Sequence, residues 1–233
     1  MEGLLKGGGS QLINYDFNDI KNGLGYTTYY GAKVTSGAIT DHILSSDVID
    51  SIHVRSNASG KSSSFSSGAL ISLSFAMSFN VPSNMNGTIY SSIPFAWRNT
   101  TTTNGEQYIL NLSIYKNNTL IASGASVYIH SLDSDTDGVN SAVKVPIIID
   151  LPNLVHFKIN DELIANVRVY GQAGSAVTHY IGIGHSPSAM ADNDLLDEVW
   201  EADTAGTTAN FLATNPITTD TKFQIKFPFK LDV

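Results

Sequence analysis

Cysteine is absent from the 233 residues, and this absence limits how the chain can be held together. Neither disulfide bonds nor thiolate chemistry is open to it, so stability has to come from packing and backbone hydrogen bonds. A chain of this length buries a substantial core, and it is a common length for one large β-domain. The lack of cysteine also suits folding in a reducing cytoplasm.

Basic residues are scarce. The chain has 13 Lys and Arg against 21 Asp and Glu, which gives a net charge of -8. Binding to nucleic acid needs clustered cations that neutralise phosphates, and here the cations are scattered. We therefore expect no direct nucleic-acid partner.

Long apolar runs are missing as well. No window approaches 18 consecutive apolar residues, so we expect no membrane span. The start, "MEGLLKGGGSQLI", lacks both the basic start and the long apolar stretch of a secretory signal, so we expect no signal peptide. The "KGGGS" stretch favours a flexible N-terminal arm over residues 1–14.

Period-two alternation is the dominant signal that is present. In "LISLSFAMSF" the apolar residues Ile71, Leu73, Phe75, Met77 and Phe79 share one face. "KFQIKFPFKL" repeats the pattern with Phe223, Ile225, Phe227, Phe229 and Leu231. Because Pro228 has no N–H, we expect this last strand at a sheet edge or unpaired on one side.

Several further short segments are rich in β-branched or aromatic residues and are separated by turn-forming residues. They predict an all-β fold: an antiparallel two-sheet β-sandwich of about ten strands, jelly-roll-like, with little helix. We expect one domain over residues 15–233, with long loops near 56–67 and 186–220. A short helix is expected at "DNDLLDEVWEAD", within the second loop.

Common catalytic motifs are not found. The sequence has no G-x-S-x-G, H-E-x-x-H or phosphate-binding loop, and no cysteine nucleophile. His185 and Ser186 are adjacent, and adjacent side chains on an extended segment point apart. We interpret the histidines as isolated residues at the surface or at the edge of the core, Trp97 as a core residue, and the protein as not an enzyme.

One motif is typical of a metal site. In "DSDTDG", Asp133, Asp135 and Asp137 with Gly138 match the first half of a calcium loop. The closing position, where a bidentate Glu is expected, is Lys144, so the motif is not an EF-hand. Two interpretations stay open: a Ca²⁺ site with distant further ligands, or an acidic loop at the end of a hairpin with no cofactor.

Five segments occur in an order that is similar to a known group. "DFNDIKNGLGYTTYYGA", "SLSFAMSFNVPSNMNGTIYSSIPFAW", "LVHFKINDELIANVRVYG", "YIGIGHSP" and "FQIKFPFKLD" resemble, over most of the chain, a widespread group of small phage and environmental-virus proteins. The resemblance implies that His156, Phe157 and Leu163, and Gly184, His185 and Pro187, are fold signatures. Ser186 stands where an acid is more usual in the group. The resemblance implies a jelly-roll-like component of a virion.

The leading hypothesis for function is therefore a structural virion protein: a capsid decoration or cement protein, a minor capsid protein, or part of a neck or tail. It would assemble in the host cytoplasm and contact copies of itself and other virion proteins. Tyr26, Tyr29 and Tyr30 offer large contact area with polar tips. The alternative is a carbohydrate- or receptor-binding β-sandwich with a glycan ligand. A hydrolase comes third, since it needs two carboxylates facing each other across a cleft.

Overall fold

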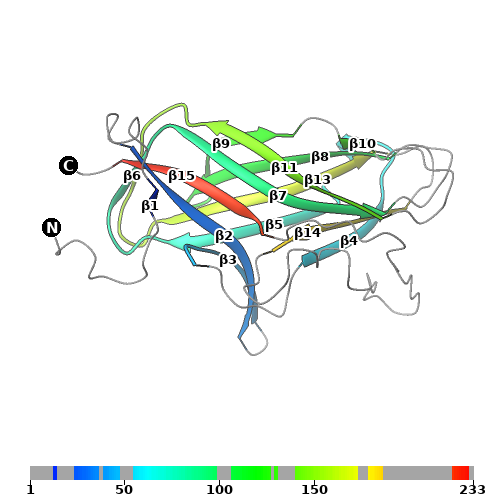
Figure 1. Cartoon of the computed structure of the whole chain (residues 1–233), viewed down its shortest axis with the longest axis horizontal. Helices are drawn as coiled ribbons and strands as arrows, with labels where there is room; N and C mark the ends of the chain where they lie inside the picture. The colour runs from blue at the N-terminus through cyan, green and yellow to red at the C-terminus, as the bar shows by residue number, and fades with distance from the viewer. Residues whose placement is uncertain are drawn as a thin grey trace.

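The computed structural model describes residues 13–14, 24–36, 39–47, 55–98, 106–126, 129–130, 140–172, 178–185 and 222–230. These residues form fifteen β-strands and one 3-10 helix, η1 (Phe65–Ser67), with no α-helix among them (Figure 1). The first eight strands are β1 (Ile13–Asn14), β2 (Leu24–Ser36), β3 (Ile39–Ser45), β4 (Arg55–Lys61), β5 (Ile71–Ser78), β6 (Ser83–Met85), β7 (Thr88–Arg98) and β8 (Gln107–Lys116). The others are β9 (Thr119–Ala125), β10 (Ile129–His130), β11 (Asn140–Asp150), β12 (Val155–Phe157), β13 (Glu162–Gln172), β14 (Thr178–Gly184) and β15 (Gln224–Lys230).

The all-β prediction is confirmed, with more strands than expected. Four of the fifteen strands, β1, β6, β10 and β12, are only two or three residues long. Strands this short leave no period-two signal in a sequence, which accounts for the lower expected number. The helix expected near residues 192–203 and the loop at 186–220 lie outside the described residues.

The hydrogen-bonded ladder joins all fifteen strands into one sheet, so the finer prediction of two separate sheets is not confirmed. The main path runs β10-β8-β13-β5-β3-β2-β15-β7-β14-β4, with β11 on the other edge of β7 and β9 on β8. Every pairing is antiparallel except that of β3 with β5, which consists of the single pair Ile43 and Ala76. That one bridge joins what would otherwise be two layers.

The sheet is nearly closed, because β9 and β11 lie against each other without a ladder between them. Gly124 of β9 permits this approach. A Cβ at Gly124 would lie 2.9 Å from Ile149 Cγ1 and 3.2 Å from the Ile148 carbonyl oxygen. Within the described residues, the approach of β9 and β11 brings together two strands that each have a ladder partner on one side only.

Alternation along the strands produces the core. In β13, Leu163, Ala165, Val167 and Val169 are all fully buried, and the intervening residues face outward. The strand β8 has the same pattern, with Leu110, Leu112 and Ile114 turned inward. Trp97 is buried and stacks on Phe95 with 5.4 Å between ring centroids, so the prediction that it is a core residue is confirmed.

Two predictions about single segments are wrong. The last strand, β15, is not an edge strand, since it pairs with β2 on one side and with β7 on the other. Pro228 is tolerated because the β7 ladder ends at Lys226, and the pairing with β6 that follows uses the Pro228 carbonyl oxygen, which accepts from the Asn86 amide at 3.0 Å. Part of the polar segment 56–67, expected to be a loop, forms β4 and pairs with β14.

Among the described residues there is no helix with the length and apolar character that crossing a membrane would need.

Candidate functional site

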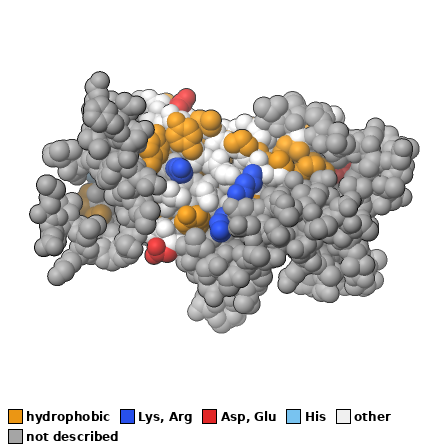
Figure 2. Space-filling view, viewed as in Figure 1, with side chains coloured by type: hydrophobic (Ala, Val, Ile, Leu, Met, Phe, Trp, Pro, Cys, Tyr) orange, Lys and Arg blue, Asp and Glu red, His pale blue; other side chains and the backbone are white. Residues whose placement is uncertain are grey.

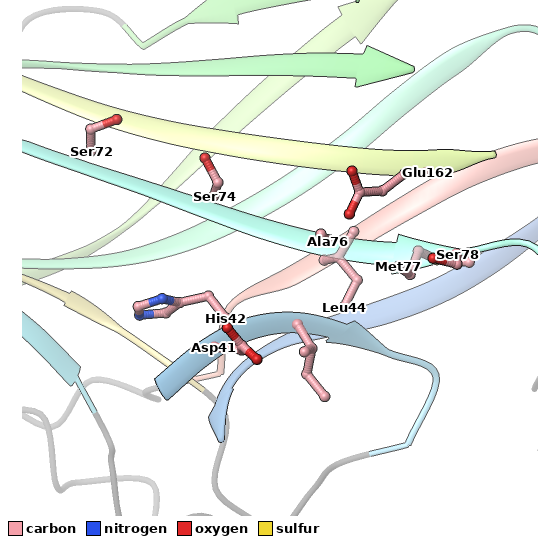
Figure 3. A pocket seen from close by; sticks show the side chains of 10 residues that line it. Asp41, His42, Leu44, Ser72, Ser74, Ala76, Met77, Ser78 and Glu162 are labelled. Atoms are coloured by element: carbon pink, nitrogen blue, oxygen red, sulfur yellow. The ribbon is translucent and has the colours of Figure 1, made fainter. Parts of the chain in front are cut away.

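A hollow of about 880 Å³ opens where β3 meets β5 and β13 (Figure 3). Because β3 and β5 share only one backbone pair, they diverge on either side of it, and the hollow occupies the space beside that bridge. Its lining combines polar and apolar side chains from the three strands: Asp41, His42, Ile43, Leu44, Ser72, Ser74, Ala76, Met77, Ser78 and Glu162.

The alternation of side chains along β5 places its serines on the side of the hollow. Ile71 and Phe75 of β5 are buried in the core, so Ser72, Ser74 and Ser78 face the other way. Glu162 is the first residue of β13 and lies opposite Ser78 in the antiparallel register. The serine and glutamate side chains therefore come from adjacent strands and reach the same surface.

A buried asparagine holds two of these serines. The side-chain nitrogen of Asn166 donates to Ser74 Oγ at 2.8 Å and to Ser72 Oγ and the Leu73 carbonyl oxygen at 3.2 Å each. The Leu73 carbonyl can only accept, so the nitrogen of the amide has to face β5. The other amide atom, Oδ1, is buried and has no hydrogen-bond partner in the described part of the chain.

Two histidines lie side by side behind this surface. The rings of His42 and His185 have centroids 5.2 Å apart at 85°, and both rings pack edge to face against Phe75. His185 is fully buried. The prediction that these two histidines are isolated is wrong, because residues far apart in the sequence meet only once β3 and the end of β14 are folded.

The segment around His156 makes a second polar cluster. Asp161 Oδ1 accepts a hydrogen bond from Asn117 Nδ2 at 2.6 Å, and its Oδ2 accepts one from the Lys158 amide at 2.8 Å and lies 3.0 Å from Lys116 Nζ. The Lys158 amide first, and then Asn117 and Lys116, hold the pKa of this carboxyl well below its usual range. These contacts connect the β8–β9 turn to the turn before β13, so we interpret the cluster as structural.

A buried acid was missed by the sequence reasoning. Glu106 is fully buried at the start of β8 and accepts a hydrogen bond from the Tyr108 hydroxyl. Burial, together with the charge and hydrogen bond of Glu106, raises the pKa of Tyr108 well above its usual value. The signal available in the sequence was the Glu-x-Tyr spacing, which places both side chains on the inward face of one strand.

An exposed face lies over β2, β15, β7 and β11, and Figure 2 shows hydrophobic side chains and lysines mixed on it. Ile148 and Tyr90 stand opposite each other on β11 and β7 and are 62% and 43% exposed. The rings of Tyr90 and Tyr26 have centroids 5.7 Å apart. We call this surface the tyrosine face; it comprises Tyr26, Tyr30, Tyr90, Pro146 and Ile148, with Lys144, Lys226, Lys230 and Asp150.

The tyrosines of the opening segment thus divide between two environments. Tyr29 is buried and packs edge to face on Phe227 with 5.8 Å between centroids, and burial raises its pKa. Tyr26 and Tyr30 occupy the alternate positions on β2 and face outward.

The residues of the calcium-like motif are not described, whereas most residues of the two expected fold signatures are. Asp133, Asp135 and Asp137 lie outside the described residues, as does Pro187. The described residues hold no group of three or more His, Asp or Glu side chains placed to bind one metal ion. Phe157, Leu163 and Gly184 are buried, and His156 is at the surface with its Nδ1 2.7 Å from Asn84 Oδ1.

No protein-family model matches the chain, and no curated protein is similar to it. Two crystal structures of a CocE/NonD family hydrolase from Staphylococcus aureus are similar in fold, at 15% and 13% identity and TM-scores of 0.45 and 0.44. They match 88% and 87% of this chain but only 37% and 36% of the hydrolase. An aminopeptidase from the marine sediment archaeon Thaumarchaeota archaeon matches at 6% identity with a TM-score of 0.42, over 87% of this chain and 37% of the aminopeptidase. This chain therefore spans little more than a third of those proteins.

The prediction that the chain is not an enzyme is contradicted, because these solved structures are hydrolytic enzymes. That prediction relied on the absence of local motifs. A search for local motifs does not detect catalytic groups that distant segments of a chain bring together. At these identities the similarity concerns the fold, and the activities of those proteins are not transferred to this chain.

Proposed function

We propose that the chain is a jelly-roll-like structural component of a virus particle, and that it assembles with copies of itself through the tyrosine face. The observation that carries the proposal is the exposed pair Ile148 and Tyr90, which stand opposite each other on β11 and β7 with lysines around them. Aromatic residues that combine apolar area with a polar tip are enriched at protein interfaces.

The charge of the tyrosine face indicates its partner. The face carries Lys144, Lys226 and Lys230 against one acid, Asp150, which is a net charge of +2. The whole chain has a net charge of -8, so the rest of it has an excess of acid amounting to -10. A basic face on an acidic chain is complementary to another surface of a second copy, which is a head-to-tail contact of the kind that builds rings.

The sequence resemblance to phage and environmental-virus proteins supports the setting of this assembly. Virion proteins need a rigid core, and this fold supplies one through its nearly closed sheet and a core with many aromatic side chains. Neighbouring subunits then contact its outward faces.

Antibody labelling tests the virion assignment. An antibody raised against the purified chain is applied to intact particles of the virus that encodes this sequence, and the particles are imaged by electron microscopy. We expect gold label at regular positions on the particle and the chain in immunoblots of purified particles. Particles that lack the chain in both assays, with the chain present in the infected cells, would contradict the assignment.

A further inference from the structure

The hollow between β3, β5 and β13 has the size and the chemistry of a small-molecule site. Its volume of about 880 Å³ falls in the ~300–1,000 Å³ range of such sites. Ile43 and Ala76 provide apolar contact, and serine hydroxyls, carboxylates and an imidazole provide polar contact (Figure 3). This combination fits a ligand that has both C–H faces and polar substituents.

The acceptors in the hollow are not used by the protein. The side chains of Asp41 and Glu162 make no hydrogen bond or ion pair within the described part of the chain, although both line the hollow. The lining includes these two carboxylates and no Lys or Arg, which disfavours a phosphate or another anionic ligand. A metal cation is disfavoured too, since the described residues offer no cluster of three ligating side chains.

The donors are held in place by Asn166. Its amide nitrogen shares two hydrogens among Ser74 Oγ, Ser72 Oγ and the Leu73 carbonyl oxygen, and towards the nitrogen both serine oxygens act as acceptors. Each hydroxyl hydrogen is then available to donate to another group, and both serines are exposed. Asn166 is itself buried, at 5% exposed, which restricts its motion and fixes the two hydroxyls.

We propose that this hollow binds a neutral sugar. The ligand hydroxyls donate to the Glu162 and Asp41 carboxylates and accept from Ser72 and Ser74, while a C–H face of the ring packs on Ile43 and Ala76. Charged hydrogen bonds to carboxylates are the stronger contacts in such a site, so Glu162 and Asp41 are expected to contribute more than the two serines.

The test uses the full chain and saturation-transfer NMR with methyl glycosides of glucose, galactose, mannose and N-acetylglucosamine. We expect transfer to at least one of the four sugars, and a roughly tenfold or greater loss of affinity in Glu162→Gln and in the double variant Ser72→Ala/Ser74→Ala. Sodium phosphate at equal concentration should not compete. Ser92→Ala, a serine on the outward side of β7, is the matched control and should bind as the wild type does.

Thermal unfolding checks that each variant is folded before its binding is compared. No transfer to any of the four sugars overturns the proposal. Binding that survives Glu162→Gln and the double serine variant also overturns it, since the sugar would then bind elsewhere. Binding lost in the double variant Tyr90→Ser/Ile148→Ser would move the site to the tyrosine face. That last variant also separates the two proposals, because it should abolish self-association and leave sugar binding unchanged.

Discussion

Asp161 connects two turns that are far apart in the sequence. Both of its oxygens are occupied, one by Asn117 and the other by the Lys158 amide and Lys116. Asn117 in turn accepts from the Glu162 amide at 2.7 Å, and Lys116 Nζ donates to the His156 carbonyl oxygen at 2.6 Å. One carboxylate therefore sets the position of the hairpin turn relative to the start of β13.

The variant Asp161→Asn should have a Tm that depends less on pH than the Tm of the wild type does, in the range below about pH 4. The folded pKa of this carboxyl lies below its unfolded value, so the charged form stabilises the protein above the unfolded pKa of about 3.9. That stabilisation is lost as the pH falls further, through the folded pKa. Asp161→Asn should lower the Tm at pH 7, and the gap from the wild type should narrow below about pH 4.

Calorimetry of both proteins between pH 7 and pH 3 measures this gap. Asp47→Asn is the control, because Asp47 is exposed and its side chain makes no hydrogen bond within the described residues. A gap that stays constant over this range would show that the Asp161 charge does not contribute.

At Gly31 the core lies directly against the backbone. A Cβ there would overlap the ring of Phe223 and lie 3.0 Å from Phe75 Cδ1, and both rings are fully buried. Gly31→Ala should lower the free energy of unfolding by about 1–3 kcal/mol, measured in urea, because the two rings have to shift. Gly60→Ala should cost less, since its Cβ would lie 3.2 Å from the flexible end of Leu70. Equal losses in the two variants would contradict this account of the core.

At the scale of elements, the β8–β9 hairpin depends on an unusual turn. Asn117 and Asn118 both have positive φ, 46° and 67°, as a two-residue type I′ turn requires. Asparagine tolerates this conformation better than most residues, and glycine is better still. The turn fixes the register of β9, which then packs against β11 through Gly124.

Substitution at Asn118 tests the turn without removing a side-chain contact, since the hydrogen bonds of the turn to Asp161 and Glu162 come from Asn117. Asn118→Ala should lower the free energy of unfolding by about 1 kcal/mol, and Asn118→Gly should leave it unchanged or raise it. Urea denaturation of the three proteins measures the difference. If alanine and glycine behave alike, the turn is not held in the left-handed conformation.

Sequence patterns predicted the elements better than their arrangement. The alternation in β5 and in β15 is local, and Phe75, Phe223 and Phe227 are buried as it indicates. The bridge between Ile43 and Ala76 leaves no trace in either segment, because a single parallel pair changes no alternation. The hollow and the His42–His185 contact both depend on that bridge, so neither could be predicted from the residues alone.

Pro228 also shows that a sequence pattern can predict a local property of a strand without predicting which strands lie beside it. Proline correctly indicates a missing ladder hydrogen bond. Whether the strand then lies at an edge, or simply where a neighbouring ladder ends, depends on the length of that neighbour. The pairing of all fifteen strands depends in the same way on how long each neighbouring strand is.

The whole molecule combines a nearly closed sheet with two outward surfaces of different chemistry. The hollow is acidic and contains serine hydroxyls, whereas the tyrosine face is apolar and basic. Because its lysines are complementary to the acidic remainder of the chain, the self-association that we propose should weaken as salt screens the charges.

Sedimentation velocity of the purified chain at micromolar concentration is the most direct test of assembly through the tyrosine face. The account predicts a species larger than the monomer at low salt, partial dissociation in about 0.5 M NaCl, and a monomer for Tyr90→Ser/Ile148→Ser under both conditions. The matched control, Val81→Ser/Leu120→Ser, removes two equally exposed apolar side chains outside the face and should sediment as the wild type does. A wild-type chain that is monomeric throughout, or a Tyr90 and Ile148 variant that assembles normally, would contradict the account.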